Sequence, residues 1–202
     1  MVSLPDRLLM TAEEYLAWEP TQEERYEYWD GEVVAMSGAT RNHNRICGAT
    51  RNHNRISLNF SKLLDDALID RPCDVYIVDV KVQVKSWQNY FYPDVVVTCD
   101  QRDDDPQLVQ FPCLIVEVLS PSTEAVDRGA KFAKYRQFST LQEYVLVQIE
   151  EPGIEVFRRN EKGQWVLSDY ALSDSLLLES VGVEIGIADL YRQVQFEVND
   201  AN

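Results

Sequence analysis

The alternation of apolar and polar residues along the chain predicts helices and strands in mixed order. Apolar residues recur at helical spacing over residues 52–68 and again over about 125–138. A capping box at Thr11 and Glu14 predicts a short helix that continues to Trp18. Apolar and β-branched runs predict strands over residues 75–84, 90–98, 112–119, 143–149, 154–158 and 164–170.

A β-hairpin is predicted near the N-terminus. Residues 25–29 and 32–36 are strand-like, and they flank Asp30 and Gly31, a dipeptide that tight hairpin turns favour. The order of elements predicts an α/β domain with a mixed sheet and helices on both faces. We expect one domain over residues 1–202, with a core at about 22–150, an N-terminal helix and a C-terminal β-rich extension at 151–192.

A short peptide is duplicated before the first long helix. Residues 38–46 recur unchanged as residues 48–56, separated by Cys47. On a continuous helix two copies ten residues apart would lie about 80° from each other around the axis, so His43 and His53 cannot serve one site equally. We favour His53, because it lies on the predicted apolar face of the helix.

The composition limits which catalytic groups and which cellular locations we expect. The 4 cysteines have no CxxC spacing, and we expect them to be reduced thiols in the core. Both of the 2 histidines lie in the duplicated peptide, which leaves acid and base chemistry mainly to carboxylates and lysines. No apolar run is long enough to span a bilayer and the N-terminus lacks a signal-peptide pattern, so we expect a soluble, cytoplasmic protein.

The formal net charge is −15, which weighs against nucleic-acid binding. The charge is uneven, however. Residues 38–85 form the only segment with more basic than acidic side chains, and Arg51 and Arg55 lie within it.

Two acids are embedded in apolar strands. Glu117 interrupts the run 114–119, and Asp94 follows Pro93 within the run 90–98. A buried carboxylate without a partner costs several kcal/mol, so a cation, a basic group or a proton must compensate for it. If the two acids converge, a divalent cation relieves their repulsion, and oxygen ligands favour Mg²⁺ or Mn²⁺. The alternative is that Glu117 ends a strand with its carboxylate in solvent.

Several motifs together resemble the Uma-two family of restriction endonucleases, which belongs to the PD-(D/E)XK nuclease superfamily. They are residues 25–32, 92–97, 115–123 and 127–135, with Glu143 and Tyr144 beyond, and the block 117–123 is the most specific. The resemblance covers residues 10–192. It implies a restriction-endonuclease-like fold, DNA as partner and a homodimer.

By this resemblance, Asp94 and Glu117 are the metal-binding acids, Glu27 is an additional acid, and His53 with Arg51 and Arg55 contacts DNA phosphates. The superfamily lysine falls on Leu119, which carries no proton chemistry. The resemblance implies that the following helix supplies the lysine instead. Lys131 would fill that role, with Asp127 and Tyr135 as supporting residues.

Other interpretations stay open. Lys134 is one turn from Lys131 and could replace it, or both lysines could be solvated. Glu27 could face water on the hairpin. A catalytically silent nuclease-fold module that binds nucleic acid or protein is the main alternative function, since Leu119 and the net charge favour it. A purely structural acidic protein would instead keep Asp94 and Glu117 apart.

Overall fold

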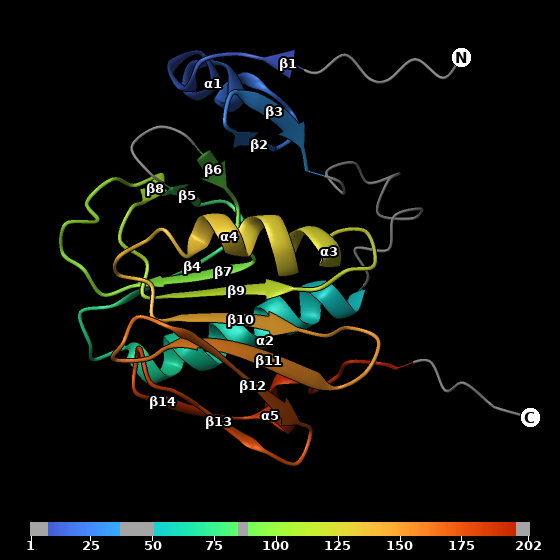
Figure 1. Ribbon diagram of the computed structural model, residues 1–202. Coiled ribbons are helices and arrows are strands. Elements are labelled where there is room, and N and C mark those ends of the chain that lie inside the picture. Colours follow the sequence, from blue (N-terminus) through green and yellow to red (C-terminus); the bar gives the residue numbers. More distant parts are fainter. Residues whose placement is uncertain (1–7, 37–50, 85–88, 197–202) are drawn as a thin grey trace, which may run out of the picture.

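A computed structural model describes residues 8–36, 51–84 and 89–196, and the first copy of the duplicated peptide, with His43, lies outside these ranges. The core is a six-stranded sheet, which Figure 1 shows with helices on both sides. In spatial order its strands are β12 (Trp165–Ala171), β11 (Gly153–Arg159), β10 (Glu143–Val147), β9 (Leu114–Val118), β7 (Val95–Thr98) and β4 (Asp74–Ile77). Only β9 and β10 are parallel among these neighbours.

A second six-stranded sheet carries the N-terminal hairpin. Its strands in spatial order are β1 (Leu8–Leu9), β3 (Glu32–Ala35), β2 (Tyr26–Trp29), β6 (Asn89–Phe91), β5 (Lys81–Val84) and β8 (Leu108–Val109). Asp30 and Gly31, with φ of 46° and 104°, form the turn between β2 and β3, as the Asp-Gly dipeptide predicts. Helix α1 (Ala12–Trp18) starts at the predicted Thr11 capping box, and a 3₁₀ turn, η1 (Glu19–Thr21), follows it.

Two predicted strands are each divided between the two sheets. The run 75–84 contains β4 and β5, which separate at Val78, a β-branched residue with φ of 53°. The run 90–98 contains β6 and β7, which separate at Pro93. The single mixed sheet of the prediction is therefore two sheets, joined by chain segments that cross from one to the other. The α/β class with a mixed sheet and flanking helices is confirmed.

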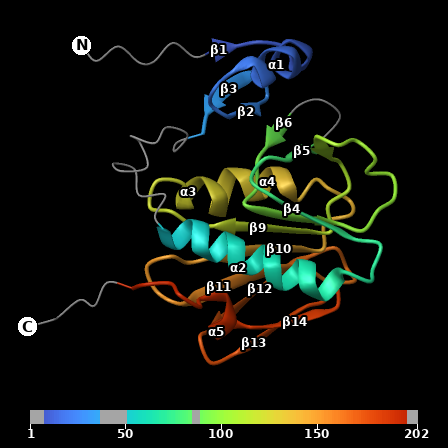
Figure 2. The ribbon, with the colours of Figure 1, turned by 180° about the vertical axis from the view of Figure 1, so that it is seen from behind.

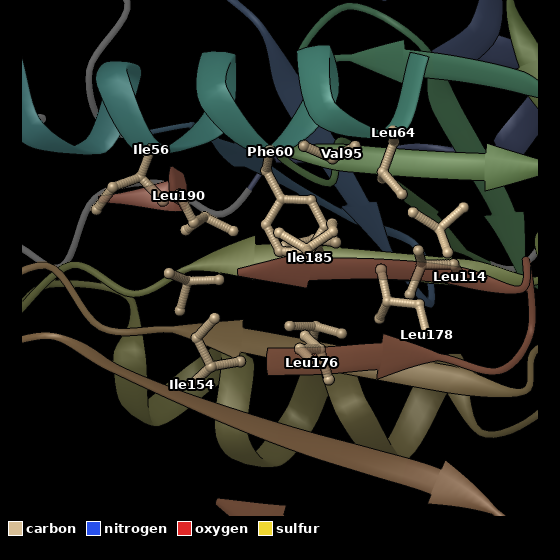
Figure 3. Close-up of a cluster of buried hydrophobic side chains, with 14 of the residues drawn as sticks. Ile56, Phe60, Leu64, Val95, Leu114, Ile154, Leu176, Leu178, Ile185 and Leu190 are labelled. Atoms are coloured by element: carbon tan, nitrogen blue, oxygen red, sulfur yellow. The ribbon is translucent and has the colours of Figure 1, made fainter. Parts of the chain in front are cut away.

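Helix α2 (Arg51–Leu68) covers one face of the core sheet. Its apolar side chains Ile56, Phe60 and Leu64 are fully buried, and Figure 3 shows them packed toward the sheet. The same layer contains elements that were not predicted individually, namely β13 (Ser175–Leu178), β14 (Val183–Gly186) and α5 (Ile187–Leu190). They lie in the predicted C-terminal extension, and Figure 2 shows α2 and this hairpin over the sheet from behind.

The opposite face is covered by one helical stretch of three parts. These are α3 (Glu124–Val126), the π-helical turn η3 (Asp127–Lys131) and α4 (Phe132–Tyr135). Phe132 and Tyr135 pack on Ile115 and Leu146 of the core sheet. The predicted helix is thus present, but a π turn widens it in the middle, a feature that is frequent at functional sites. None of the helices in the described ranges is long and apolar enough to cross a membrane.

The expectation of reduced cysteines is wrong for Cys73 and Cys99, and for Cys47 it lies outside the described residues. Cys73 and Cys99 form a disulfide, and Cys113 is free with its sulfur 3.9 Å from that of Cys99. The cause is the antiparallel pairing of β4 with β7, where Asp74 lies opposite Thr98 and the preceding and following cysteines meet. Spacing along the sequence does not reveal such a pairing.

Removal of this disulfide should lower the stability of the fold. The bridge closes a loop with a sequence separation of 26, which corresponds to about 3.5 kcal/mol of chain entropy. We expect Cys73→Ser to lower the free energy of unfolding in urea by about 2–4 kcal/mol. The difference from the parent should vanish when both are measured in reductant. A parent whose stability is the same with and without reductant would contradict the bridge.

Candidate acid and lysine site

Asp94 lies at the break between β6 and β7, just after Pro93. Proline has no N–H for a sheet ladder, so the strand begins after it. The pairing of Val95 with Val116, continued by one residue, places Asp94 opposite Glu117. The Val118 N–H donates a hydrogen bond of 2.7 Å to Asp94 Oδ2. Asp94 and Glu117 therefore lie close together. This excludes the interpretation of the chain as a purely structural acidic protein, in which the two acids would lie apart.

Glu117 is buried within β9, with 3% of its surface exposed. The Tyr135 hydroxyl donates to Glu117 Oε1 over 2.9 Å, and Lys131 Nζ lies 3.2 Å from the same oxygen. Burial raises the pKa of Glu117 well above its ordinary value, Lys131 opposes the rise, and the carboxylates of Asp127, Asp94 and Glu27 add to it. The alternative interpretation, in which Glu117 ends a strand with its carboxylate in solvent, is therefore excluded.

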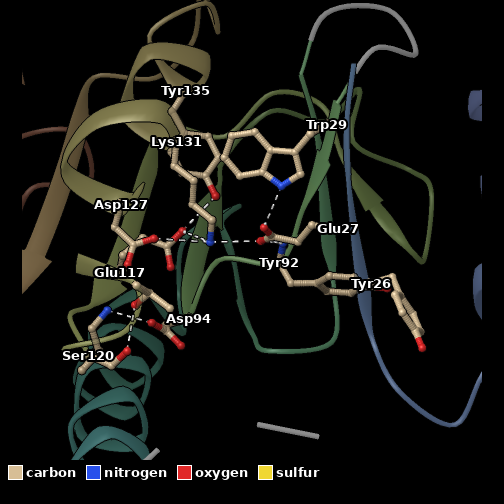
Figure 4. Close-up of polar contacts among 12 residues, drawn as sticks. Tyr26, Glu27, Trp29, Tyr92, Asp94, Glu117, Ser120, Asp127, Lys131 and Tyr135 are labelled. Carbon is tan, nitrogen blue, oxygen red and sulfur yellow. Dashed lines mark hydrogen bonds and ion pairs between the residues drawn. The ribbon is translucent and has the colours of Figure 1, made fainter. Parts of the chain in front are cut away.

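Lys131 reaches the centre of the site from the π-helical turn. Its ammonium lies 3.0 Å from Glu27, 3.2 Å from Glu117 and 3.5 Å from Asp127 (Figure 4). Burial lowers the pKa of Lys131, but these three carboxylates outweigh burial and hold the pKa well above its usual value. The lysine is therefore charged.

The position two residues after Glu117 plays no part in the site. Leu119 is buried in the apolar core between the sheet and α4. Lys134 pairs with Asp30 in the hairpin turn, away from the acids. Of the two candidate lysines, the structure brings only Lys131 to Glu117.

Glu27 enters the site from β2 of the other sheet. It is buried, and it accepts hydrogen bonds from Trp29 Nε1 at 3.2 Å and from the Tyr92 N–H at 3.4 Å. The alternation within the hairpin therefore turns Glu27 inward, and the reading with a wet hairpin face is wrong.

The first turn of α2 brings His53 to the acids. His53 Nε2 lies 3.3 Å from Asp94 Oδ2. Burial lowers the pKa of His53, but the hydrogen bond and charge of Asp94 outweigh it, so the net shift is upward. Arg51 and Arg55 lie in the same turn, exposed and half-buried, and the described ion pairs join neither of them to an acid of the site.

Asp127 and Tyr135, which the sequence suggested only as supporting residues, both contact the charged groups of the site directly. Asp127 is 2% exposed, its Oδ1 accepts no hydrogen bond in the described part of the chain, and burial raises its pKa. Tyr135 orients Glu117. The available signal was the spacing of Asp127, Lys131 and Tyr135, which are four residues apart and so share one helix face.

The donor set fits a hard divalent cation. Asp94 and Glu117 offer carboxylate oxygens, and the partly exposed side chains of Asp94 and His53 give the cluster access to solvent. Three carboxylates contact a single lysine and Asp94 lies opposite one of them, so carboxylates outnumber the ammonium in this cluster. Within residues 8–36, 51–84 and 89–196 no three His, Cys, Asp or Glu side chains are yet arranged to hold a metal ion. Instead, the Lys131 ammonium lies between Glu27 on one side and Glu117 and Asp127 on the other.

Comparisons with known proteins show the family of the chain. The model of the Uma2 family, described as “Putative restriction endonuclease”, matches residues 12–50 and 48–190, two segments that overlap within the duplicated peptide. An uncharacterized protein of Synechocystis sp. is 41% identical over 188 residues, 93% of this chain and 94% of the relative. A second one is 34% identical over 164 residues, 80% and 87% of the two chains.

The fold is also similar to a solved structure. A crystal structure from Anabaena variabilis, described as “a putative nuclease”, matches with a TM-score of 0.71 and 15% sequence identity, over 92% of this chain and 99% of that one. At this identity the match shows a shared fold.

Proposed function

The chain belongs to the Uma2 family of restriction-endonuclease-like proteins, and from that premise we propose that it is a metal-dependent endonuclease that hydrolyses phosphodiester bonds in DNA. The observation that carries the proposal is the position of Asp94 opposite Glu117 in the sheet, together with the contact of the Lys131 ammonium with Glu117. It supplies the acid pair and the lysine of such a site, although Leu119 occupies the usual lysine position.

Asp94 and Glu117 would hold Mg²⁺ or Mn²⁺. The cation would stabilise negative charge that grows on the phosphate oxygens. The Val118 N–H and His53 fix Asp94, while Tyr135 fixes Glu117, so both carboxylates are oriented before the substrate arrives. This preorganisation reduces the reorganisation that the reaction requires.

Lys131 would position the attacking water and stabilise charge. Because its pKa is raised, it acts as a hydrogen-bond donor rather than as a base. Glu27, at 3.0 Å from the ammonium, would orient the water and take up its proton. A P–O bond to the water forms, the P–O bond to the sugar breaks, and the leaving sugar oxygen gains a proton from solvent.

The DNA would lie across the open side of the cluster. His53 contacts Asp94, which favours a positioning role for it over a contact with phosphate. Arg51 and Arg55, in the basic segment, would contact the DNA backbone. Two acid sites would serve the two strands of DNA, so we also propose that the protein acts as a homodimer, in the cytoplasm.

Incubation with supercoiled plasmid tests the proposal. We expect nicked and then linear DNA in millimolar Mg²⁺ or Mn²⁺, and no product in EDTA. If the folded protein binds the metal but cleaves neither single-stranded nor double-stranded DNA, the endonuclease proposal fails and a silent module replaces it.

A further inference from the structure

The Lys131 ammonium is the positive charge that lies among three carboxylates of the site. Glu117 and Asp127 lie on one side of it and Glu27 on the other, at 3.2, 3.5 and 3.0 Å (Figure 4). Lys131 itself is buried, with 8% of its surface exposed. Solvent therefore screens these contacts weakly.

The charge of the cluster is not balanced by this lysine. Three carboxylates share its ammonium, and a fourth, Asp94, lies opposite Glu117 in the sheet. Next to Asp94 lies His53, whose Nε2 is 3.3 Å from Asp94 Oδ2. A divalent cation at Asp94 and Glu117 would supply the missing positive charge, but it would repel the ammonium that touches Glu117.

Asp127 offers the ammonium another position. It is four residues before Lys131 in the chain, and its buried Oδ1 accepts no hydrogen bond in the described part of the structure. A buried oxygen without a donor is unfavourable, so a shift of the ammonium toward Asp127 would satisfy that oxygen. Glu27 can stay in contact with the lysine throughout.

We propose that Lys131 is a displaceable counter-ion: a divalent cation at Asp94 and Glu117 competes with its ammonium for Glu117, and Asp127 receives the ammonium that is released. This inference rests on the metal site of the proposed function and adds a positioning role for Asp127. Because the cation and the ammonium compete, each weakens the binding of the other by the same factor.

Calorimetric titration with Mn²⁺ tests this on the full chain without any need for activity. Lys131→Met removes the competitor, so we expect Mn²⁺ to bind at least about tenfold tighter than in the parent. Asp127→Asn removes the receiving carboxylate, so we expect binding about tenfold weaker. Lys134→Met is the matched control from the same helix, because its ammonium pairs with the exposed Asp30, and binding should stay unchanged.

A second measurement, of the melting temperature, keeps the test valid if a variant does not fold without metal. Lys131→Met leaves three carboxylates without their common partner, so the variant could unfold in EDTA. Thermal melts in EDTA and in saturating Mn²⁺ should then show a larger rise in melting temperature for Lys131→Met than for the parent, and a smaller one for Asp127→Asn.

The outcomes separate this inference from the proposed function. Equal or weaker Mn²⁺ binding by Lys131→Met, with an equal rise in melting temperature, overturns the displacement while the metal site stands. Unchanged binding by Asp127→Asn overturns its receiving role. If neither the parent nor any variant binds Mn²⁺, the metal site itself is wrong and the displacement falls with it.

Discussion

Asp94→Asn and Glu117→Gln should each lower metal-dependent DNA cleavage by at least about a thousandfold, which corresponds to about 4 kcal/mol of transition-state stabilisation. Each change replaces a charged oxygen ligand by a neutral amide of nearly the same shape. Neither should unfold the protein, since each removes one of four repelling carboxylates from a buried cluster. Initial rates of plasmid nicking at fixed Mg²⁺ measure the effect.

A matched acid outside the site provides the control for these rates. Asp66 is exposed in the last turn of α2, and Asp66→Asn changes the net charge by the same amount. We expect its cleavage rate to equal that of the parent. Retention of the parent rate by both Asp94→Asn and Glu117→Gln, with the fold intact, would show that these acids are not the reaction centre.

Lys81→Met should lower the free energy of unfolding by about 3–5 kcal/mol. Glu19 is 1% exposed, and its carboxylate pairs with Lys81 Nζ at 2.8 Å and accepts a hydrogen bond from the Tyr92 hydroxyl at 2.8 Å. Loss of the lysine leaves a buried charge with one neutral donor and the more distant Arg25 at 3.9 Å. Urea denaturation measures the loss.

The control for this prediction is again Lys134→Met. Its ion pair with Asp30 lies at the surface, where 23% of the Lys134 side chain and 57% of the Asp30 side chain are exposed, and such pairs contribute less than about 1 kcal/mol. The double variant Glu19→Gln with Lys81→Met should recover part of the loss, because no buried charge is then left alone. A loss below about 1 kcal/mol for Lys81→Met would mean that this pair does not hold η1 to β5.

Local patterns in the sequence predicted the parts of the fold that local chemistry determines. The Thr11 capping box, the Asp30-Gly31 turn and the apolar face of α2 depend on residues within a few positions of one another. Asp94 and Glu117 could also be predicted as a pair, because an acid within an apolar strand requires a partner.

Features that depend on strand pairing could not be predicted in the same way. Pro93 marks a break within the run 90–98, but nothing in this run or in the run 75–84 shows that the two halves of each belong to different sheets. The pairing of β4 with β7 also decides that Cys73 and Cys99 meet.

The choice of lysine needed the structure as well. Lys131 and Lys134 are three residues apart, and the sequence does not distinguish them. In the structure, Lys131 lies in the π-helical turn and contacts Glu117, whereas Lys134 contacts Asp30 in the hairpin turn. Such a turn has no clear signature in a single sequence. That Asp127 Oδ1 accepts no hydrogen bond in the described part of the chain is likewise visible only in the structure.

Anomalous diffraction from crystals grown in millimolar Mn²⁺ would test the central claim most directly. We predict a manganese peak within ligand distance of carboxylate oxygens of both Asp94 and Glu117, with the Lys131 ammonium farther from Glu117 than the 3.2 Å seen here. Crystals that show these two carboxylates well ordered, with no peak between them and Lys131 unmoved, would contradict the account.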